Sequence, residues 1–121
     1  SALAGVLGVA LPDYLLSHPF EVLEGETYDS FKRMLIDKLY RLPEGICETY
    51  IHPGVDDPWM RERIPHWEKR VWEFRLMMDD DFRYAIRDAG VTLVDYRHVR
   101  RHGRESRLRA GARLAGALLG R

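Results

Sequence analysis

The feature that most limits the possible folds is the alternation of helix-like and strand-like segments between prolines and glycines. Apolar residues recur at helical spacing over residues 28–42, with Thr27 as the predicted N-cap, and "PEG" at 43–45 ends that helix. Residues 46–52 are rich in β-forming side chains and are predicted to be a strand. Such alternation indicates βα units around a parallel sheet.

The rest of the chain continues this alternation. Asp57 and Pro58 are predicted to cap and start a short helix. A longer helix is predicted from Pro65 to about residue 78, and residues 79–82 either continue it or cap a further helix that ends before Gly90. Residues 91–96 are predicted to form a second strand, and 9–26 to be irregular. The core-facing stripe predicted for the longer helix is Trp67, Val71, Phe74 and Met78.

The length of 121 residues fits one globular α/β domain, and two predicted strands are too few for a closed barrel. We therefore expect either a small α/β domain or part of a larger one. The single cysteine, Cys47, cannot form an internal disulfide, and a cytoplasmic protein is expected. No run of about 20 apolar residues occurs, so no transmembrane segment is expected. The apolar N-terminus has no basic region before it and is not read as a signal peptide.

Charge is distributed unevenly along the chain. Residues 1–96 hold 11 Lys and Arg against 18 Asp and Glu, a net charge of −7, whereas residues 97–121 hold eight arginines against Glu105, a net charge of +7. The basic tail could contact nucleic acid, anionic lipid or the acidic body of the same protein. We favour the acidic body and expect no nucleic acid. The tail has Leu108, Ala112, Ala115 and Leu119 at helical spacing, which predicts an amphipathic helix, and we treat 103–121 as a segment separate from 1–102.

The segment "CETYIHPGVDDPW", residues 47–59, contains the main candidate for chemistry, His52. At the carboxyl end of a parallel strand, His52 would face the crevice where α/β folds bind ligands. An imidazole there can transfer a proton near neutral pH. The alternative is a polar residue at a strand end, followed by a Pro-Gly turn.

Glu48 would share a strand face with His52 and would need a partner for its buried carboxylate. Arg70 could be that partner, or it could pair with Glu73 on a helix surface.

Two further residues are candidates for sugar binding. Asp56 could bind a sugar hydroxyl or orient His52, whereas Asp57 is better explained as a helix cap. Trp59 is the best candidate for a platform on which a sugar ring stacks. Asp79, Asp80 and Asp81 point in different directions on a helix, and the other histidines have no ligand spacing, so no metal site is predicted within this chain.

The block "LPEGICETYIHPGVDD" resembles the late segment of the YdjC-like carbohydrate deacetylases, which include chitooligosaccharide deacetylases. "HWEKRVWEFRLMMDDDF" and "AGVTLVDYRHV" resemble the segments after it in that family, and "LGVALPDYLL" resembles the stretch before it. The resemblance covers about residues 3–100. It implies the C-terminal half of a TIM-barrel-like (β/α) fold, with the arginine-rich helix outside it.

The resemblance also implies a reaction, the hydrolysis of N-acetyl groups on amino sugars or oligosaccharides with a divalent metal, Mg²⁺ or Zn²⁺. His52 matches the family's late histidine and would be the acid that protonates the departing amine or a group that stabilises the tetrahedral intermediate. Glu48, Arg70, Asp56 and Trp59 would bind substrate.

The family's early Asp-Asp motif and its metal-binding histidines have no match in residues 1–51. We therefore expect this chain to bind no metal alone and to be inactive without its missing N-terminal half or a second copy. A homo-oligomer would cover open sheet edges. The alternative function is a non-catalytic binding or interaction module on the same scaffold.

Overall fold

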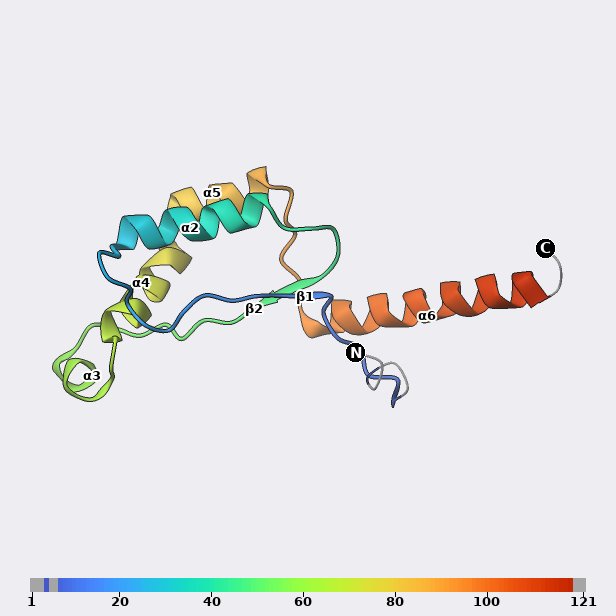
Figure 1. Cartoon of the computed structure of the whole chain (residues 1–121), viewed down its shortest axis with the longest axis horizontal. Helices are drawn as coiled ribbons and strands as arrows, with labels where there is room; N and C mark the ends of the chain where they lie inside the picture. Colours follow the sequence, from blue (N-terminus) through green and yellow to red (C-terminus); the bar gives the residue numbers. More distant parts are fainter. Residues whose placement is uncertain (1–3, 5–6, 119–121) are drawn as a thin grey trace. The chain divides into compact units, whose positions relative to one another are not determined.

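The computed structural model describes residue 4 and residues 7–118, with side chains as far as Arg109 apart from residues 106 and 107. The chain divides into two compact units, residues 14–92 and residues 1–13 with 93–121, and each is described by itself. In chain order the elements are β1 (Tyr14–Leu16), α2 (Tyr28–Tyr40), β2 (Cys47–Thr49), α3 (Pro58–Arg63), α4 (Trp67–Met78), α5 (Asp80–Asp88) and α6 (Tyr96–Leu118) (Figure 1).

The predicted starts of α2 and α3 are confirmed by side-chain caps, whereas α4 begins at Trp67, two residues after the predicted Pro65, and its N-cap His66 makes no side-chain hydrogen bond. Thr27 and Ser30 form a capping box at the start of α2, in which the hydroxyl of each accepts a hydrogen bond from the backbone N–H of the other. Asp57 accepts from Met60 N at 2.8 Å and starts α3, with Pro58 as its first residue. Asp79 ends α4 and caps α5, so the two are separate helices.

The core of the larger unit lies between α2 and the α4–α5 pair, and α2 runs alongside α5 (Figure 1). Phe31 and Leu76 are fully buried at its centre. Tyr28 and Leu35 complete the buried cluster, and Met34, Trp72 and Phe82 pack against it. Burying these side chains is the main source of stability for this unit.

The predicted core stripe of α4 is wrong. Trp67 and Val71 are half-buried, but Phe74 and Met78 are exposed, at 39% and 64%. The buried residues of α4 are instead Lys69, Glu73 and Leu76. Helical spacing defines several possible faces, and here the face that carries two charged residues turns inward, because Lys69 is paired with Glu26 and Glu73 with His18.

The sheet consists of β1 and β2, paired in parallel with Leu15 opposite Glu48. Residues 14–16 were predicted to be irregular, but β1 forms there, beginning with Tyr14 N donating to Ile46 O at 3.1 Å. β2 ends at Thr49, so the predicted strand over 46–52 is too long and His52 lies three residues beyond it.

The strand predicted at 91–96 is also wrong. Gly90, with φ 73°, forms a Schellman end to α5, in which Gly90 N donates to Arg87 O and Val91 N to Ile86 O, both at 3.0 Å. Residues 91–95 then form no strand, and α6 already begins at Tyr96. β-forming side chains make a strand only where a neighbouring strand offers a ladder.

The smaller unit contains α6, which runs through residues 102 and 103 without a break. Asp95 starts it by accepting from the backbone N–H groups of Arg97 and His98. Gly103 lies close to Ala10, since a Cβ at Gly103 would be 2.9 Å from the Ala10 Cβ. The predicted apolar positions Ala112, Ala115 and Leu119 lie outside the described side chains, and Leu108 is exposed. Within the described residues, no helix could cross a membrane.

Candidate functional site

A small pocket of about 80 Å³ lies in the larger unit beside His52. Segments far apart in the sequence form it, namely the chain after β1, the chain after β2 and the start of α4. Its lining residues are Phe20, His52, Pro65, His66, Lys69, Arg70 and Glu73. The pocket therefore brings together two of the predicted site residues, His52 and Arg70.

Glu73 anchors the chain beneath this pocket. It is 1% exposed, and its Oε1 lies 2.8 Å from His18 Nε2. Its Oε2 accepts a hydrogen bond from the backbone N–H of His52. A buried carboxylate is stable only when both oxygens have such partners. Glu73 on α4 therefore holds both the His18 segment and the His52 segment in place.

The residues after His52 are held by the same helix. Gly54 N donates to Arg70 O at 3.0 Å, one turn before Glu73 on α4. A Cβ at Gly54 would lie 2.8 Å from Met60 Sδ and 3.4 Å from Arg70 Cβ. The Pro-Gly pair is thus more than a surface turn, because glycine lets the backbone approach α4 and α3 closely.

The His52 imidazole lies against two aromatic rings and makes no hydrogen bond with any residue that the structure describes. Its centroid lies 4.8 Å from Phe20 and 5.8 Å from Tyr50, both at steep ring angles. Nδ1 of His52 is buried, and no described residue supplies a partner for it. The hydrogen-bonding capacity of this imidazole is therefore not used by the described residues.

The two cations of the pocket differ in their pairing. Lys69 is 2% exposed, and its Nζ lies 2.5 Å from Glu26 Oε1 and 4.7 Å from the centre of the Phe31 ring. The half-buried Arg70 guanidinium makes no hydrogen bond or ion pair with any residue that the structure describes. Lys69 is therefore neutralised internally, whereas the charge of Arg70 is available to a ligand.

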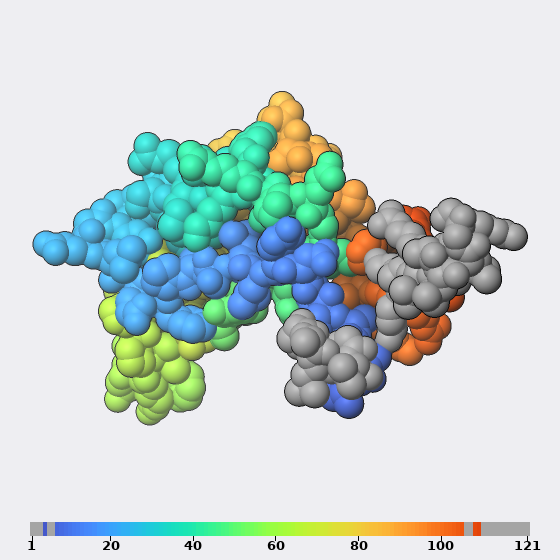
Figure 2. All heavy atoms as spheres, turned by 45° about the vertical axis from the view of Figure 1, so that its right-hand side comes forward, coloured from blue at the N-terminus to red at the C-terminus, as the bar shows by residue number. Residues whose placement is uncertain are grey.

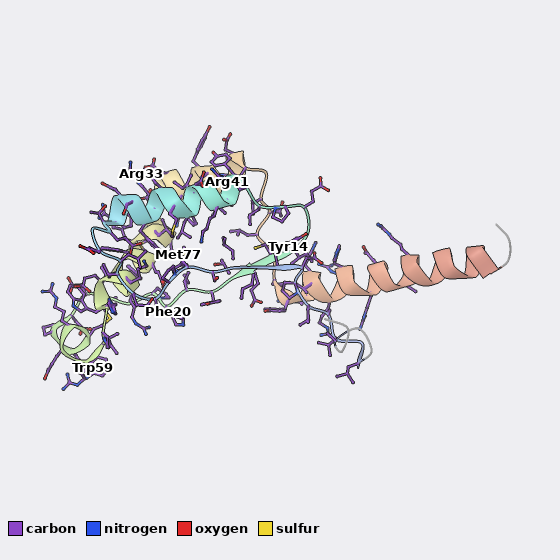
Figure 3. The ribbon with its side chains drawn as sticks, in the orientation of Figure 1. Tyr14, Phe20, Arg33, Arg41, Trp59 and Met77 are labelled. Carbon is purple, nitrogen blue, oxygen red and sulfur yellow. The ribbon has the colours of Figure 1, made fainter. Side chains whose placement is uncertain are left out.

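The other predicted site residues do not line this pocket. Glu48 is half-buried in β2, opposite Leu15. Asp56 is bound by Arg61 through contacts of 2.6 and 2.7 Å, and this guanidinium lowers the pKa of the Asp56 carboxyl. Trp59 is 59% exposed on α3, which protrudes from the larger unit (Figures 2 and 3). The Arg63 guanidinium covers its ring, with Cζ 5.2 Å from the ring centre.

The described residues do not fit the metal that the family resemblance implies. Within residues 4 and 7–118, no three His, Cys, Asp or Glu side chains lie together so that they could hold an ion. Asp79 and Asp81 instead bind Lys32 at 3.1 and 2.8 Å. Any metal-dependent step needs ligands that this part of the chain does not supply.

Sequence reasoning missed the residues that build this site. His18 and Glu73 are separated by 55 positions, and no motif links them. A surface ion pair between Arg70 and Glu73 was one prediction, but Glu73 is buried and binds His18 instead. The spacing of Lys69 and Glu73, four residues apart on a helix, gave no signal of their burial, because such a spacing usually indicates an exposed pair.

Comparisons with protein-family models, with curated proteins and with solved structures find no match to this chain.

Proposed function

We propose that this chain is the C-terminal part of a metal-dependent carbohydrate deacetylase of the YdjC-like type. In this proposal it contributes His52 to a site that is completed by a missing N-terminal half or by a second copy. The observation that carries the proposal is His52, which lines a pocket, is held through its backbone by buried Glu73 and has a buried Nδ1 with no partner among the described residues.

The proposed role of His52 is proton donation. Hydrolysis of an N-acetyl group breaks the bond between the carbonyl carbon and the sugar nitrogen, and the departing amine must receive a proton. An imidazole whose nitrogens make no internal hydrogen bond can carry that proton to the amine. The hydrogen bond from His52 N to Glu73 holds the backbone of His52, and the rings of Phe20 and Tyr50 flank its imidazole, which supports the positioning that a general acid requires.

The small parallel sheet supports the proposal that part of the fold is missing. A parallel pair is normally covered on both faces, yet Tyr14 and Leu15 of β1 are 45% and 60% exposed. A further strand or a neighbouring element would cover these side chains in a larger α/β fold. The metal and the base would then come from that added part.

The test is release of acetate from N-acetylglucosamine oligomers, measured with Mg²⁺, with Zn²⁺ and with a chelator. This chain is assayed beside a longer protein that includes the sequence upstream in its gene. We expect activity in the longer protein alone. In that protein, His52→Ala should lower the rate by about 100-fold or more, which is the usual contribution of a general acid.

His98→Ala is the matched control, because His98 is an exposed histidine on α6 and should leave the rate unchanged. Full turnover in His52→Ala would remove His52 from the chemistry. No acetate release from the longer protein under any metal condition would favour the alternative, a non-catalytic binding module.

A further inference from the structure

Arg70 carries an unpaired charge next to an unpaired imidazole. Arg70 lines the pocket together with His52, and its guanidinium has no acceptor among the described residues. A guanidinium presents a planar set of donors that matches the two oxygens of a carboxylate. Half-buried donors of this kind are most stable when an acceptor binds them.

Arg70 is the cation in the pocket lining whose charge is left for a small anion. Lys69 and Arg70 contribute two positive charges to the lining, and Glu73 contributes one negative charge. Lys69 is already paired with Glu26, which lies outside the lining. A dianion such as phosphate would be repelled twice as strongly by the Glu73 carboxylate as a monoanion, and its desolvation on entering so small a pocket would be more costly.

The size and the walls of the pocket favour a very small ligand with one apolar end. A volume of about 80 Å³ admits a few non-hydrogen atoms and excludes a sugar ring. Phe20 and Pro65 supply apolar surface beside the two polar groups. The backbone around the pocket is held by hydrogen bonds, including Val22 N to His66 Nδ1 at 3.0 Å.

From these observations we propose that the pocket is a binding site for a small monocarboxylate of the size of acetate. The carboxylate would bind the Arg70 guanidinium, with the His52 imidazole as a second hydrogen-bonding group, and the methyl group would contact Phe20. This inference deepens the proposed function, and the biological role of the site rests on that function, since acetate is the second product of N-deacetylation. Binding itself is independent of turnover.

The experiment is a titration of the full isotope-labelled chain with sodium acetate, followed by NMR at constant ionic strength with chloride as the balancing ion. We expect saturable shifts of the His52 imidazole and of the Phe20 ring. Inorganic phosphate should produce smaller shifts that do not saturate in the same range. Arg70→Gln should weaken acetate binding by about tenfold or more, because a charge-assisted pair is lost.

Arg87→Gln is the matched control, since it removes an exposed arginine of α5 that does not line the pocket, and it should bind acetate like the unchanged chain. Equal binding by Arg70→Gln, equal binding of phosphate, or no saturable shift would overturn the proposal. If Arg70→Gln does not fold, the titration of the unchanged chain still tests the proposal. Saturable shifts at residues other than His52 and Phe20 would then overturn the acetate site.

The two proposals fail differently. Acetate binding in the pocket with no acetate release by the longer protein would contradict the deacetylase function and leave the binding site. Acetate release by the longer protein without acetate binding in the pocket would contradict the binding site and leave the function.

Discussion

Glu73 connects more of the candidate site than any other residue. One carboxylate oxygen contacts the His18 imidazole and the other accepts the His52 backbone N–H, so a single side chain holds two segments against α4. The sequence predicted His52 as a site residue but did not predict Glu73 as its anchor. The reason is that burial of a charged side chain depends on partners distant in the sequence, which composition and periodicity do not specify.

Glu73→Gln tests this connection. An amide keeps the shape of the side chain but has only one oxygen, so its NH₂ group must face either His52 N–H or His18. We expect the free energy of unfolding to fall by about 1–3 kcal/mol, the usual cost of leaving a buried donor unpaired. Urea unfolding followed by circular dichroism measures it.

The control for that variant is Glu44→Gln, an exposed residue of the loop before β2. Its free energy of unfolding should change by less than about 0.5 kcal/mol. Equal unfolding midpoints for the two variants would mean that the buried contacts of Glu73 add no net stability.

At the level of elements, polar contacts at Asp79 tie α2 to the junction between α4 and α5. Asp79 accepts hydrogen bonds from the Tyr28 hydroxyl at 2.6 Å and from Lys32 Nζ at 3.1 Å. Both hydrogen bonds lower the pKa of the Asp79 carboxyl, and the bond from the Tyr28 hydroxyl has the larger effect. Burial and the bond to Asp79 raise the pKa of Tyr28 to about 12.

Tyr28→Phe removes this bond and should lower the free energy of unfolding by about 1–3 kcal/mol at neutral pH. The lowered pKa of Asp79 adds stability above the unfolded value of 3.8, and this is lost as pH falls through the folded value. The raised pKa of Tyr28 adds stability below pH 10, and this is lost as pH rises from 10 to about 12. The difference in free energy of unfolding between Tyr28→Phe and the unchanged chain should therefore be constant between pH 3.8 and pH 10. It should shrink at lower and at higher pH.

Urea unfolding at a series of pH values measures that difference, with the exposed Tyr84→Phe as the control. A difference that stays constant into strong acid would show that Asp79 is not the acceptor that matters.

The helix caps on both sides of this contact were predictable, because Thr27, Asp57 and Asp79 act on N–H groups within three residues. The pairing of β1 with β2 was not, since it joins residues 33 positions apart (Tyr14 with Cys47).

At the scale of the whole molecule, the larger unit leaves apolar side chains uncovered on its sheet. Tyr14 and Leu15 are exposed on β1, and within the described residues the sheet has only two strands (Figure 3). Open edges and exposed apolar side chains of this kind promote association with another chain.

We therefore expect this chain to self-associate as its concentration rises, and Leu15→Lys to shift it toward the monomer by placing a charge on the exposed strand. Sedimentation velocity over a range of concentrations measures the shift. Leu23→Lys, an exposed leucine outside the strands, is the control and should associate like the unchanged chain. A monomer at every concentration of the unchanged chain would contradict the expectation.

The sequence by itself determined the helices between residues 27 and 89 and the caps Thr27 and Asp57, because these depend on interactions between near neighbours. Only the tertiary structure decided which face of α4 is buried, that β1 exists and that residues 91–95 form no strand. It also decided that Arg70 lines the pocket without an acceptor among the described residues, while Glu73 is buried with His18. Each of these outcomes depends on a partner distant in the chain, and the free energy that selects it is gained only when the segments meet.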